Sequence, residues 1–255
     1  MLEVPAYLNR IAYSGSTEPT RETLRELHRA HMFAVPFENL DIHIGRPIVC
    51  EESRFLHKII DERRGGFCYE LNGAFAALLR ELGFEVTLLS ARVARADGTS
   101  SPEFDHLALR VDVEEPWLAD VGFGDSFLEP LRLQTNLEQP QIGRVYRLTQ
   151  AEDAFHVEVK SGDKWKREYS LTLQPRQLRD FADRCHYHQT SPDSHFTQNR
   201  ICSRATPTGR ITLSNGRFIE TRDESKQERP LTEHEWAACS RDLFGVVLPS
   251  GGRGP

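Results

Sequence analysis

The stretch "RRGGFCYELNGAF", residues 63–75, decides how the first part of the chain folds and what chemistry the chain can perform. Two glycines precede a cysteine, and an apolar pattern with helical spacing begins directly after it. Glycine lets the backbone approach its neighbours closely, so Gly65 and Gly66 predict a tight loop. The helix that follows should begin at Cys68 and end near Gly83, because glycine is favoured just past a helix end. The Cys68 thiol is therefore expected at the N-terminus of a buried helix.

The spacing of apolar residues changes twice along the chain. Residues 1–84 follow the three-to-four spacing of helices. From residue 85 the spacing becomes two, which predicts short strands of a mostly antiparallel sheet or barrel up to residue 185. Residues 186–255 mix both patterns, so the fold class is α+β. Just before and within this last part, the pattern predicts a helix at 175–185, a polar loop at 188–199 and strands at 210–214 and 217–222. A helix capped by Thr232 and Glu235 should follow, and the tail at 249–255 is expected to be disordered.

Composition excludes several classes of protein. The chain has 255 residues, of which 38% are hydrophobic and 27% charged, as in ordinary globular proteins. It lacks an apolar run of roughly 20 residues and a signal-peptide pattern, so the cytosol is the default location. A net charge of −6 argues against a nucleic-acid or anionic-membrane partner. The five cysteines are an odd number and widely spaced, which favours free thiols over disulfides.

A cysteine becomes a nucleophile as a thiolate, which a helix N-terminus and a neighbouring imidazole both favour. Cys68 has the first by position. His106 opens a well-alternating strand, and Asp120 closes the next one, where antiparallel pairing can bring the two together. The hypothesis is a triad of nucleophile, base and orienting carboxylate in the order Cys68, His106, Asp120. On the residues alone, the alternatives stay open: a buried apolar cysteine, a core or surface histidine, and a turn aspartate.

Longer blocks give the sequence a family resemblance. These are "VPFENLDI" at 35–42, "RGGFCYELN" at 64–72, "FDHLAL" at 104–109, "WLADVGFG" at 117–124 and "TSPDSHF" at 190–196. Through them the chain resembles the arylamine N-acetyltransferases along most of its length. The resemblance implies three lobes around a cysteine-protease-like catalytic core. They would be a helical bundle at 1–84 carrying the nucleophile, a β-barrel at 85–185 carrying the histidine and aspartate, and an α/β lid at 186–255.

The resemblance also implies a reaction. Cys68 would take the acetyl group of acetyl-CoA as a thioester and pass it to an arylamine, arylhydrazine or N-hydroxyarylamine in a ping-pong mechanism. Acetyl-CoA would be a co-substrate, with no tightly bound cofactor. We expect a cytoplasmic enzyme of xenobiotic metabolism with no nucleic-acid, membrane or obligate protein partner.

Further site residues follow from the same resemblance. An apolar wall for the aromatic ring would consist of Phe37, Phe123 and, with weaker support, Val93. Arg64 and Glu38 would belong to a buried ionic network that supports the loop before Cys68. The CoA contacts implied are the turn Gly122, Phe123 and Gly124 together with Tyr187, Thr190, Ser191 and Ser194.

Several alternatives compete with this interpretation. A zinc site at Cys185, His188, His195 and Cys202 is disfavoured because the spacing does not match common fingers, so no metal is expected. An amide synthase of the same fold would use Cys68 to close a polyketide chain on an aromatic amine. A thiol hydrolase would use the same triad with water. A non-catalytic scaffold is disfavoured because Cys68, His106 and Asp120 are all present.

Overall fold

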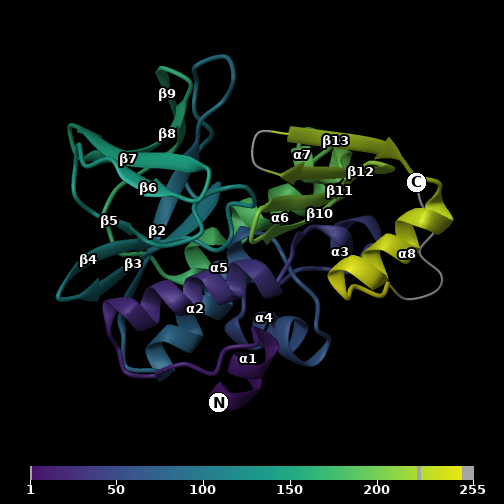
Figure 1. Ribbon diagram of the computed structural model, residues 1–255, viewed down its shortest axis with the longest axis horizontal. Coiled ribbons are helices and arrows are strands. Elements are labelled where there is room, and N and C mark those ends of the chain that lie inside the picture. The colour runs from purple at the N-terminus through teal and green to yellow at the C-terminus, as the bar shows by residue number, and fades with distance from the viewer. Residues whose placement is uncertain (1, 223–224, 249–255) are drawn as a thin grey trace.

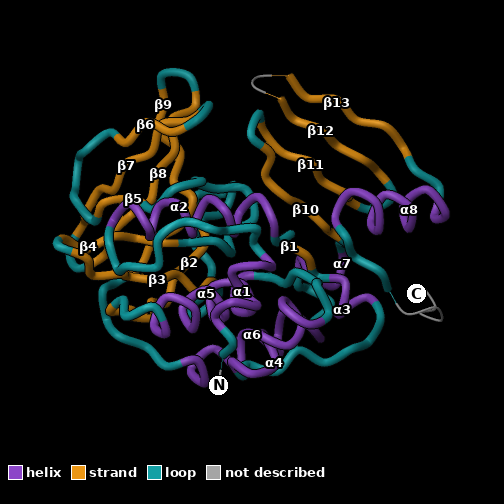
Figure 2. Tube along the Cα trace, turned by 60° about the horizontal axis from the view of Figure 1, so that its bottom comes forward, coloured by secondary structure: helices purple, strands orange, loops and turns teal. Residues whose placement is uncertain are grey.

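The computed structural model describes residues 2–222 and 225–248, which form a mixed α/β fold (Figure 1). The expected disorder of residues 249–255 lies outside the described residues. Figure 2 shows two separate groups of strands, with the helices of the first third gathered along one side of them. Within the described residues, every helix is too short or too polar to cross a bilayer.

The first third is helical, as the spacing predicts. Thr20 caps α2 by accepting a hydrogen bond from the backbone N–H of Thr23. Helix α5 begins at Cys68, as expected, and is buried along most of its length, so it forms the centre of the main hydrophobic core. The elements are α1 (Val4–Arg10), α2 (Arg21–Ala34), α3 (Leu40–His43), α4 (Glu52–Leu56), the π-helical turn η1 (His57–Asp61) and α5 (Cys68–Glu81).

Residues 85–171 form an eight-stranded antiparallel sheet, which confirms the predicted sheet or barrel. Its order is β5-β4-β3-β2-β9-β8-β7-β6, so strands β2 and β9, far apart in sequence, are neighbours. Alternate residues on one face of each strand form a second apolar core. The strands are β2 (Glu85–Val93), β3 (His106–Val113), β4 (Glu115–Ala119), β5 (Leu131–Arg132), β6 (Gln139–Gln141), β7 (Arg144–Ala151), β8 (Ala154–Ser161) and β9 (Lys164–Leu171).

Two glutamine side chains bridge the open edge between β5 and β6. Gln139 accepts from the backbone N–H of Arg132 at 2.8 Å and donates to its carbonyl at 3.2 Å. Gln141 accepts from the N–H groups of Leu128 and Glu129 at 2.8 and 3.0 Å and donates to the Glu129 carbonyl at 2.7 Å. These amides satisfy backbone groups that edge strands leave unpaired. The sheet is therefore nearly closed into a barrel.

The last third forms a five-stranded antiparallel sheet in the order β1-β10-β11-β12-β13. Its first strand comes from the beginning of the chain, since Phe37 pairs with Ser203. The first and last thirds are thereby joined by backbone pairing, and the three-domain division stays a prediction. The elements are β1 (Phe37–Glu38), 3-10 helix η2 (Leu178–Phe181), α6 (Ala182–Thr190), α7 (His195–Gln198), β10 (Ile201–Thr206), β11 (Gly209–Ser214), β12 (Arg217–Arg222), β13 (Ser225–Pro230) and α8 (Glu233–Phe244).

Some details of the last third differ from the sequence prediction. The capping box of Thr232 and Glu235 and both expected strands are confirmed. The polar loop at 188–199 is wrong in part, because α6 continues to Thr190 and α7 occupies four of its residues. Strand β13 was missed because its residues are all exposed, so it lacks an apolar alternation.

The glutamine bridge gives a test of barrel closure. Gln141→Ala should lower the free energy of unfolding by about 1 to 3 kcal/mol, because three backbone groups of Leu128 and Glu129 lose their partners. Urea denaturation at neutral pH measures the change. Gln134→Ala, an exposed position in the same segment, is the matched control. Equal stability of the two variants would contradict a structural role for the bridge.

Candidate active site

The two glycines before Cys68 are required by close packing rather than by a left-handed turn. A Cβ on Gly65 would lie 1.9 Å from the carbonyl oxygen of Pro36, and one on Gly66 would lie 2.6 Å from the Glu70 side chain. The Gly66 carbonyl accepts the backbone N–H of Glu38 at 2.8 Å. The loop therefore lies directly against β1, and the close backbone approach predicted at the two glycines is confirmed.

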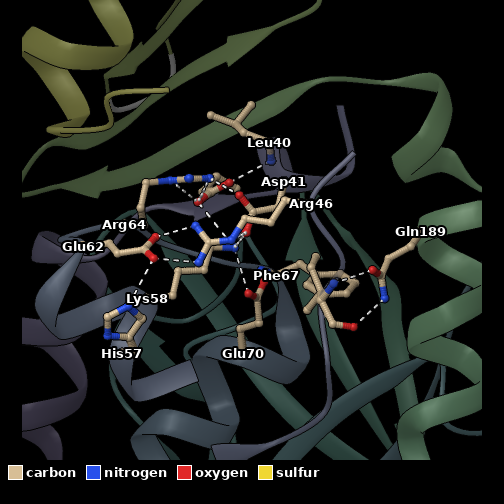
Figure 3. A network of polar contacts seen from close by, with 12 residues as sticks. Leu40, Asp41, Arg46, His57, Lys58, Glu62, Arg64, Phe67, Glu70 and Gln189 are labelled. Carbon is tan, nitrogen blue, oxygen red and sulfur yellow. Dashed lines mark hydrogen bonds and ion pairs between the residues drawn. The ribbon is translucent and has the colours of Figure 1, made fainter. Parts of the chain in front are cut away.

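A buried cluster of five charged side chains supports this loop, and Figure 3 labels four of them: Asp41, Lys58, Arg64 and Glu70. Arg64 Nη2 lies 2.8 Å from Glu38 and 2.9 Å from Asp41. Lys58 Nζ lies 2.9 Å from Asp41 and 2.7 Å from Glu70. All five side chains are buried. The expected pairing of Arg64 with Glu38 is thus part of a larger network, which we call the loop-support cluster.

The loop-support cluster contains three carboxylates and two cations. The Arg46 guanidinium lies on the solvent side of the cluster, 3.8 Å from Asp41. It also binds the Glu62 carboxylate. Although burial disfavours its charge, the surrounding carboxylates hold the pKa of Lys58 above its ordinary value. Removing one member of a buried ion pair costs about 3 to 5 kcal/mol, because the partner charge stays buried. The cluster therefore fixes the position of the loop.

Glu70 connects the loop-support cluster to the helix that carries the cysteine. Its Oε2 accepts the backbone N–H of Phe67 at 3.1 Å, and its Oε1 accepts from Lys58. A carboxylate in this place caps the first turn of α5. Burial raises the pKa of Glu70 to about 7, with Lys58 acting in the opposite direction. The residue before Cys68 is thus tied to the ionic cluster.

His106 and Asp120 form a buried pair, as the sequence hypothesis requires. Nε2 of His106 lies 2.7 Å from Oδ2 of Asp120. Burial raises the pKa of Asp120, but His106 and the hydrogen bonds from Asn72 and Gly122 lower it more, so the net shift is downward. Asp120 is therefore a carboxylate that can orient the imidazole and stabilise its positive form. Nδ1 is the ring nitrogen left for proton exchange.

Asn72 ties this pair to the helix of Cys68. It lies one turn after Cys68, and its amide donates to Oδ1 of Asp120 at 2.8 Å and to the Leu107 carbonyl at 2.6 Å. Its oxygen accepts the backbone N–H of Val121 at 2.9 Å. One side chain thus holds the helix that begins at Cys68 against the segments that carry His106 and Asp120. The sequence hypothesis did not include Asn72, although its spacing of four from Cys68 places both on one helix face.

Two further residues pack against the same strands. A Cβ on Gly122 would lie 2.8 Å from Cα of Cys68 and 2.7 Å from Nδ2 of Asn72, so this glycine permits the close approach. His28 on α2 accepts the backbone N–H of Asp120 on Nε2 at 3.1 Å and donates from Nδ1 to the Leu128 carbonyl at 2.8 Å. The neutral imidazole satisfies both groups at once.

The Cys68 thiol is buried, with a relative exposure of 3% for the residue. Burial raises its pKa well above the usual value, while the backbone N–H groups of Leu107 and Tyr69 act in the opposite direction. Its position at the helix start therefore does not by itself produce a thiolate.

Aromatic side chains surround the pair. The Phe123 ring lies 5.1 Å from the His106 ring and 5.0 Å from Tyr169, measured between centroids. Phe37 lies on the other side of the turn, where a Cβ on Gly124 would be 3.6 Å from its ring. Val93 and Phe123 line the same cavity. The three residues expected to form an apolar wall thus all lie near the turn at Gly122–Gly124.

The polar residues expected to bind CoA lie in the segment of α6 and α7. Ser194 is buried and accepts the backbone N–H of Phe196, which caps α7. Thr190 donates to the His186 carbonyl, and Ser191 accepts the N–H of Asp193. Tyr187 lies under the Arg184 guanidinium at 4.1 Å. These hydroxyls have local structural roles, and CoA contacts by them stay a prediction.

All five cysteines are free, which confirms the prediction of free thiols. In residues 2–222 and 225–248, three or more potential metal ligands do not converge anywhere. His188, one of the residues weighed as a zinc ligand, lies 3.1 Å from Asp105 instead.

Comparisons with known proteins agree on one family. A sequence model described as N-acetyltransferase matches residues 20–252. The Salmonella typhimurium protein named arylamine N-acetyltransferase / N-hydroxyarylamine O-acetyltransferase is 39% identical over 216 residues, covering 84% of this chain and 77% of the relative. A solved arylamine N-acetyltransferase from Salmonella typhimurium has a TM-score of 0.92 at 33% identity, covering 100% of this chain and 95% of that one. The Mycobacterium marinum arylamine N-acetyltransferase in complex with CoA has a TM-score of 0.89 at 32% identity, covering 96% and 93%.

The chain therefore belongs to the arylamine N-acetyltransferase family. The match extends over both sheets and the helices that carry the candidate site.

Asn72→Ala tests the connection between the helix and the strands. It should lower the free energy of unfolding by about 2 to 4 kcal/mol, because the Leu107 carbonyl and the Val121 N–H lose the partner that Asn72 supplies and Oδ1 of Asp120 keeps only the Gly122 N–H. It should also reduce turnover by disturbing Asp120. Chemical denaturation and an acetyl-transfer assay measure the two effects. Asn9→Ala, at an exposed position of α1, is the control, and a similar result for both variants would contradict the proposed connection.

The burial of His28 predicts a pH dependence of stability. Burial lowers the pKa of His28 from 6.5 to about 4. In that interval the unfolded chain binds the proton more readily, so the stability contributed by neutral His28 is lost as the pH falls. Relative to His28→Gln, the natural protein should lose about 2 kcal/mol of unfolding free energy between about pH 8 and pH 5. Urea titrations at both pH values measure this, and parallel pH profiles for the two proteins would contradict it.

Proposed function

We propose that this protein is an acetyl-CoA:arylamine N-acetyltransferase that works through a thioester on Cys68. The observation that carries the proposal is the buried His106–Asp120 pair held by Asn72 against the helix of Cys68. Family membership supports acetyl transfer as the reaction, and the CoA complex of the relative from Mycobacterium marinum supports acetyl-CoA as the co-substrate.

In the first half-reaction, Nδ1 of His106 takes the proton of the Cys68 thiol. The sulfur attacks the thioester carbonyl of acetyl-CoA, the bond to the CoA sulfur breaks, and the protonated imidazole returns the proton to the leaving thiolate. Asp120 stabilises the imidazolium in between. Because burial disfavours an isolated thiolate at Cys68, the charge has to form as an ion pair with His106.

In the second half-reaction, an aromatic amine, hydrazine or N-hydroxyarylamine attacks the acetyl carbonyl on Cys68. The nitrogen gives its proton to His106, the bond to the Cys68 sulfur breaks, and the thiol is regenerated. Exchange of one thioester for another is nearly neutral in energy, so the acyl-enzyme stores the acetyl group until an amine arrives. Phe37, Phe123 and Val93 would supply the apolar wall for the aromatic ring.

This proposal includes the finer expectations of the family. The catalytic core would be similar to that of cysteine proteases, and residues 186–255 would act as the α/β lid of three lobes. The CoA would contact the turn at Gly122–Gly124 and the α6–α7 segment. The enzyme would act on xenobiotic amines in the cytoplasm without a tightly bound cofactor.

Intact-mass measurement tests the thioester directly. Incubation with acetyl-CoA in the absence of an amine should add one acetyl group, and an aromatic amine should remove it. Cys68→Ala should form no adduct. Cys239→Ser, which removes a partly exposed thiol at a distant position on α8, should acetylate like the natural protein.

Other outcomes would distinguish the competing functions. Steady release of CoA in the absence of an amine, with no adduct, would identify a thiol hydrolase. An adduct that persists in Cys68→Ala would contradict the nucleophile. An acetyl group that no aromatic amine removes would contradict the transferase and favour the amide synthase, whose acyl donor is then the next substrate to test.

A further inference from the structure

A cavity of about 380 Å³ is lined by the ends of α1, α2 and α8, by the loop before Cys68 and by β10. Its volume falls within the range of small-molecule sites. We call it the four-arginine cavity, because its lining includes Arg10 on α1, Arg63 in the loop, Arg204 on β10 and Arg241 on α8. Among the described residues of the lining, Asp242 is the one carboxylate.

The carboxylate of Asp242 already has a partner. It lies 2.8 Å from Nε of Arg241, its neighbour in the chain, and both side chains are exposed. In residues 2–222 and 225–248, the other three arginines of the cavity have no carboxylate at ion-pair distance. The cavity therefore contains three guanidinium charges that the described part of the protein does not neutralise.

Arg10 is buried, with a relative exposure of 6%, and it donates only to backbone carbonyls. Its Nε donates to Ile59 and its Nη1 to Ala34, both at 2.9 Å. Its Nη2 donates to the carbonyls of Arg63 and Arg64 at 3.3 and 3.2 Å. A buried charge is costly without an opposite charge beside it. The three helix ends at the cavity supply roughly half a negative charge each, less than three guanidinium groups carry.

Arg63 and Arg204 add positive charge with unused donors. The backbone of Arg63 has a φ of +51°, which a residue with a side chain rarely adopts, and its side chain is exposed. The Arg204 guanidinium lies 5.8 Å from the centroid of the Phe244 ring, and its buried Nε has no hydrogen-bond partner among the described residues. Burial and, after it, the charges of Arg63 and Arg204 lower the pKa of Arg10 to about 10. The three charges are thus close enough to repel.

We propose that the four-arginine cavity binds a phosphate-class oxyanion with two or more negative charges, such as pyrophosphate, at a site separate from that of acetyl-CoA. Guanidinium groups bind phosphate oxygens through paired N–H donors, which Arg63 and Arg204 have free. Because Arg10 holds the carbonyls of Arg63 and Arg64, the bound anion would stabilise the loop that leads to Cys68. The inference does not depend on the proposed function.

Isothermal titration calorimetry with pyrophosphate tests the site, in a phosphate-free buffer at constant ionic strength. The natural protein should bind one pyrophosphate. Arg63→Gln and Arg204→Gln should each raise the Kd about tenfold, because each removes a charge-assisted hydrogen bond. Arg179→Gln, at an exposed position of η2 that does not line the cavity, is the matched control. An absence of saturable binding, or the same Kd in all four proteins, would overturn the inference.

Coenzyme A also carries phosphates, so its contribution is measured separately. The Kd for pyrophosphate should be the same with and without saturating CoA. The KM for acetyl-CoA should be unchanged in Arg63→Gln and Arg204→Gln. Competition by CoA, or a raised KM in both variants, would assign the cavity to the phosphates of CoA and contradict a separate site.

Binding should also stabilise the folded protein. At 100 times its Kd, pyrophosphate should raise the unfolding temperature of the natural protein by about 5 to 10 °C. The double variant Arg63→Gln/Arg204→Gln should show little of this shift. It is expected to fold, because neither arginine side chain donates a hydrogen bond within the described part of the chain. An equal shift in the double variant would mean that pyrophosphate binds elsewhere and would contradict the inference.

Discussion

The loop-support cluster holds together the part of the fold on which the site depends. Glu38 comes from β1, Asp41 from α3, Lys58 from η1, Arg64 from the loop and Glu70 from α5. Charged side chains that are buried away from water need oppositely charged partners at close range. The five segments that carry these side chains are therefore held in one arrangement relative to each other. The loop at 62–67 forms no helix or strand of its own, and the contacts of this cluster fix its conformation.

Cys68 lies in a fixed, buried position that disfavours its charged thiolate form. Burial disfavours the thiolate, and its position at the helix N-terminus does not reverse this. In the proposed mechanism the proton of Cys68 passes to His106, whose partner Asp120 is held by Asn72.

The barrel contributes both His106 and the cavity beside Phe123. Strand β3 begins at His106, and β2 and β8 place Val93 and Val159 at the neighbouring end of the same sheet. A single nearly closed sheet thus sets the distance between His106 and this cavity. The pairing of Asp125 with Arg144 of the barrel and Arg210 of the second sheet connects the turn after Asp120 to both sheets.

Local sequence determined much of the fold: the helix beginning at Cys68, the close approach at Gly65 and Gly66, the alternating strands from residue 85 and the capping box of α8. Each of these depends on a few consecutive residues and their spacing. The pairing of His106 with Asp120 was also within reach, because the two residues lie at the ends of neighbouring strands. Only the tertiary structure decided the roles of Asn72 and Lys58, since a polar residue in sequence looks the same whether it faces water or a buried partner. Burial and strand register bring distant residues together, and neither is encoded in any short stretch of the chain.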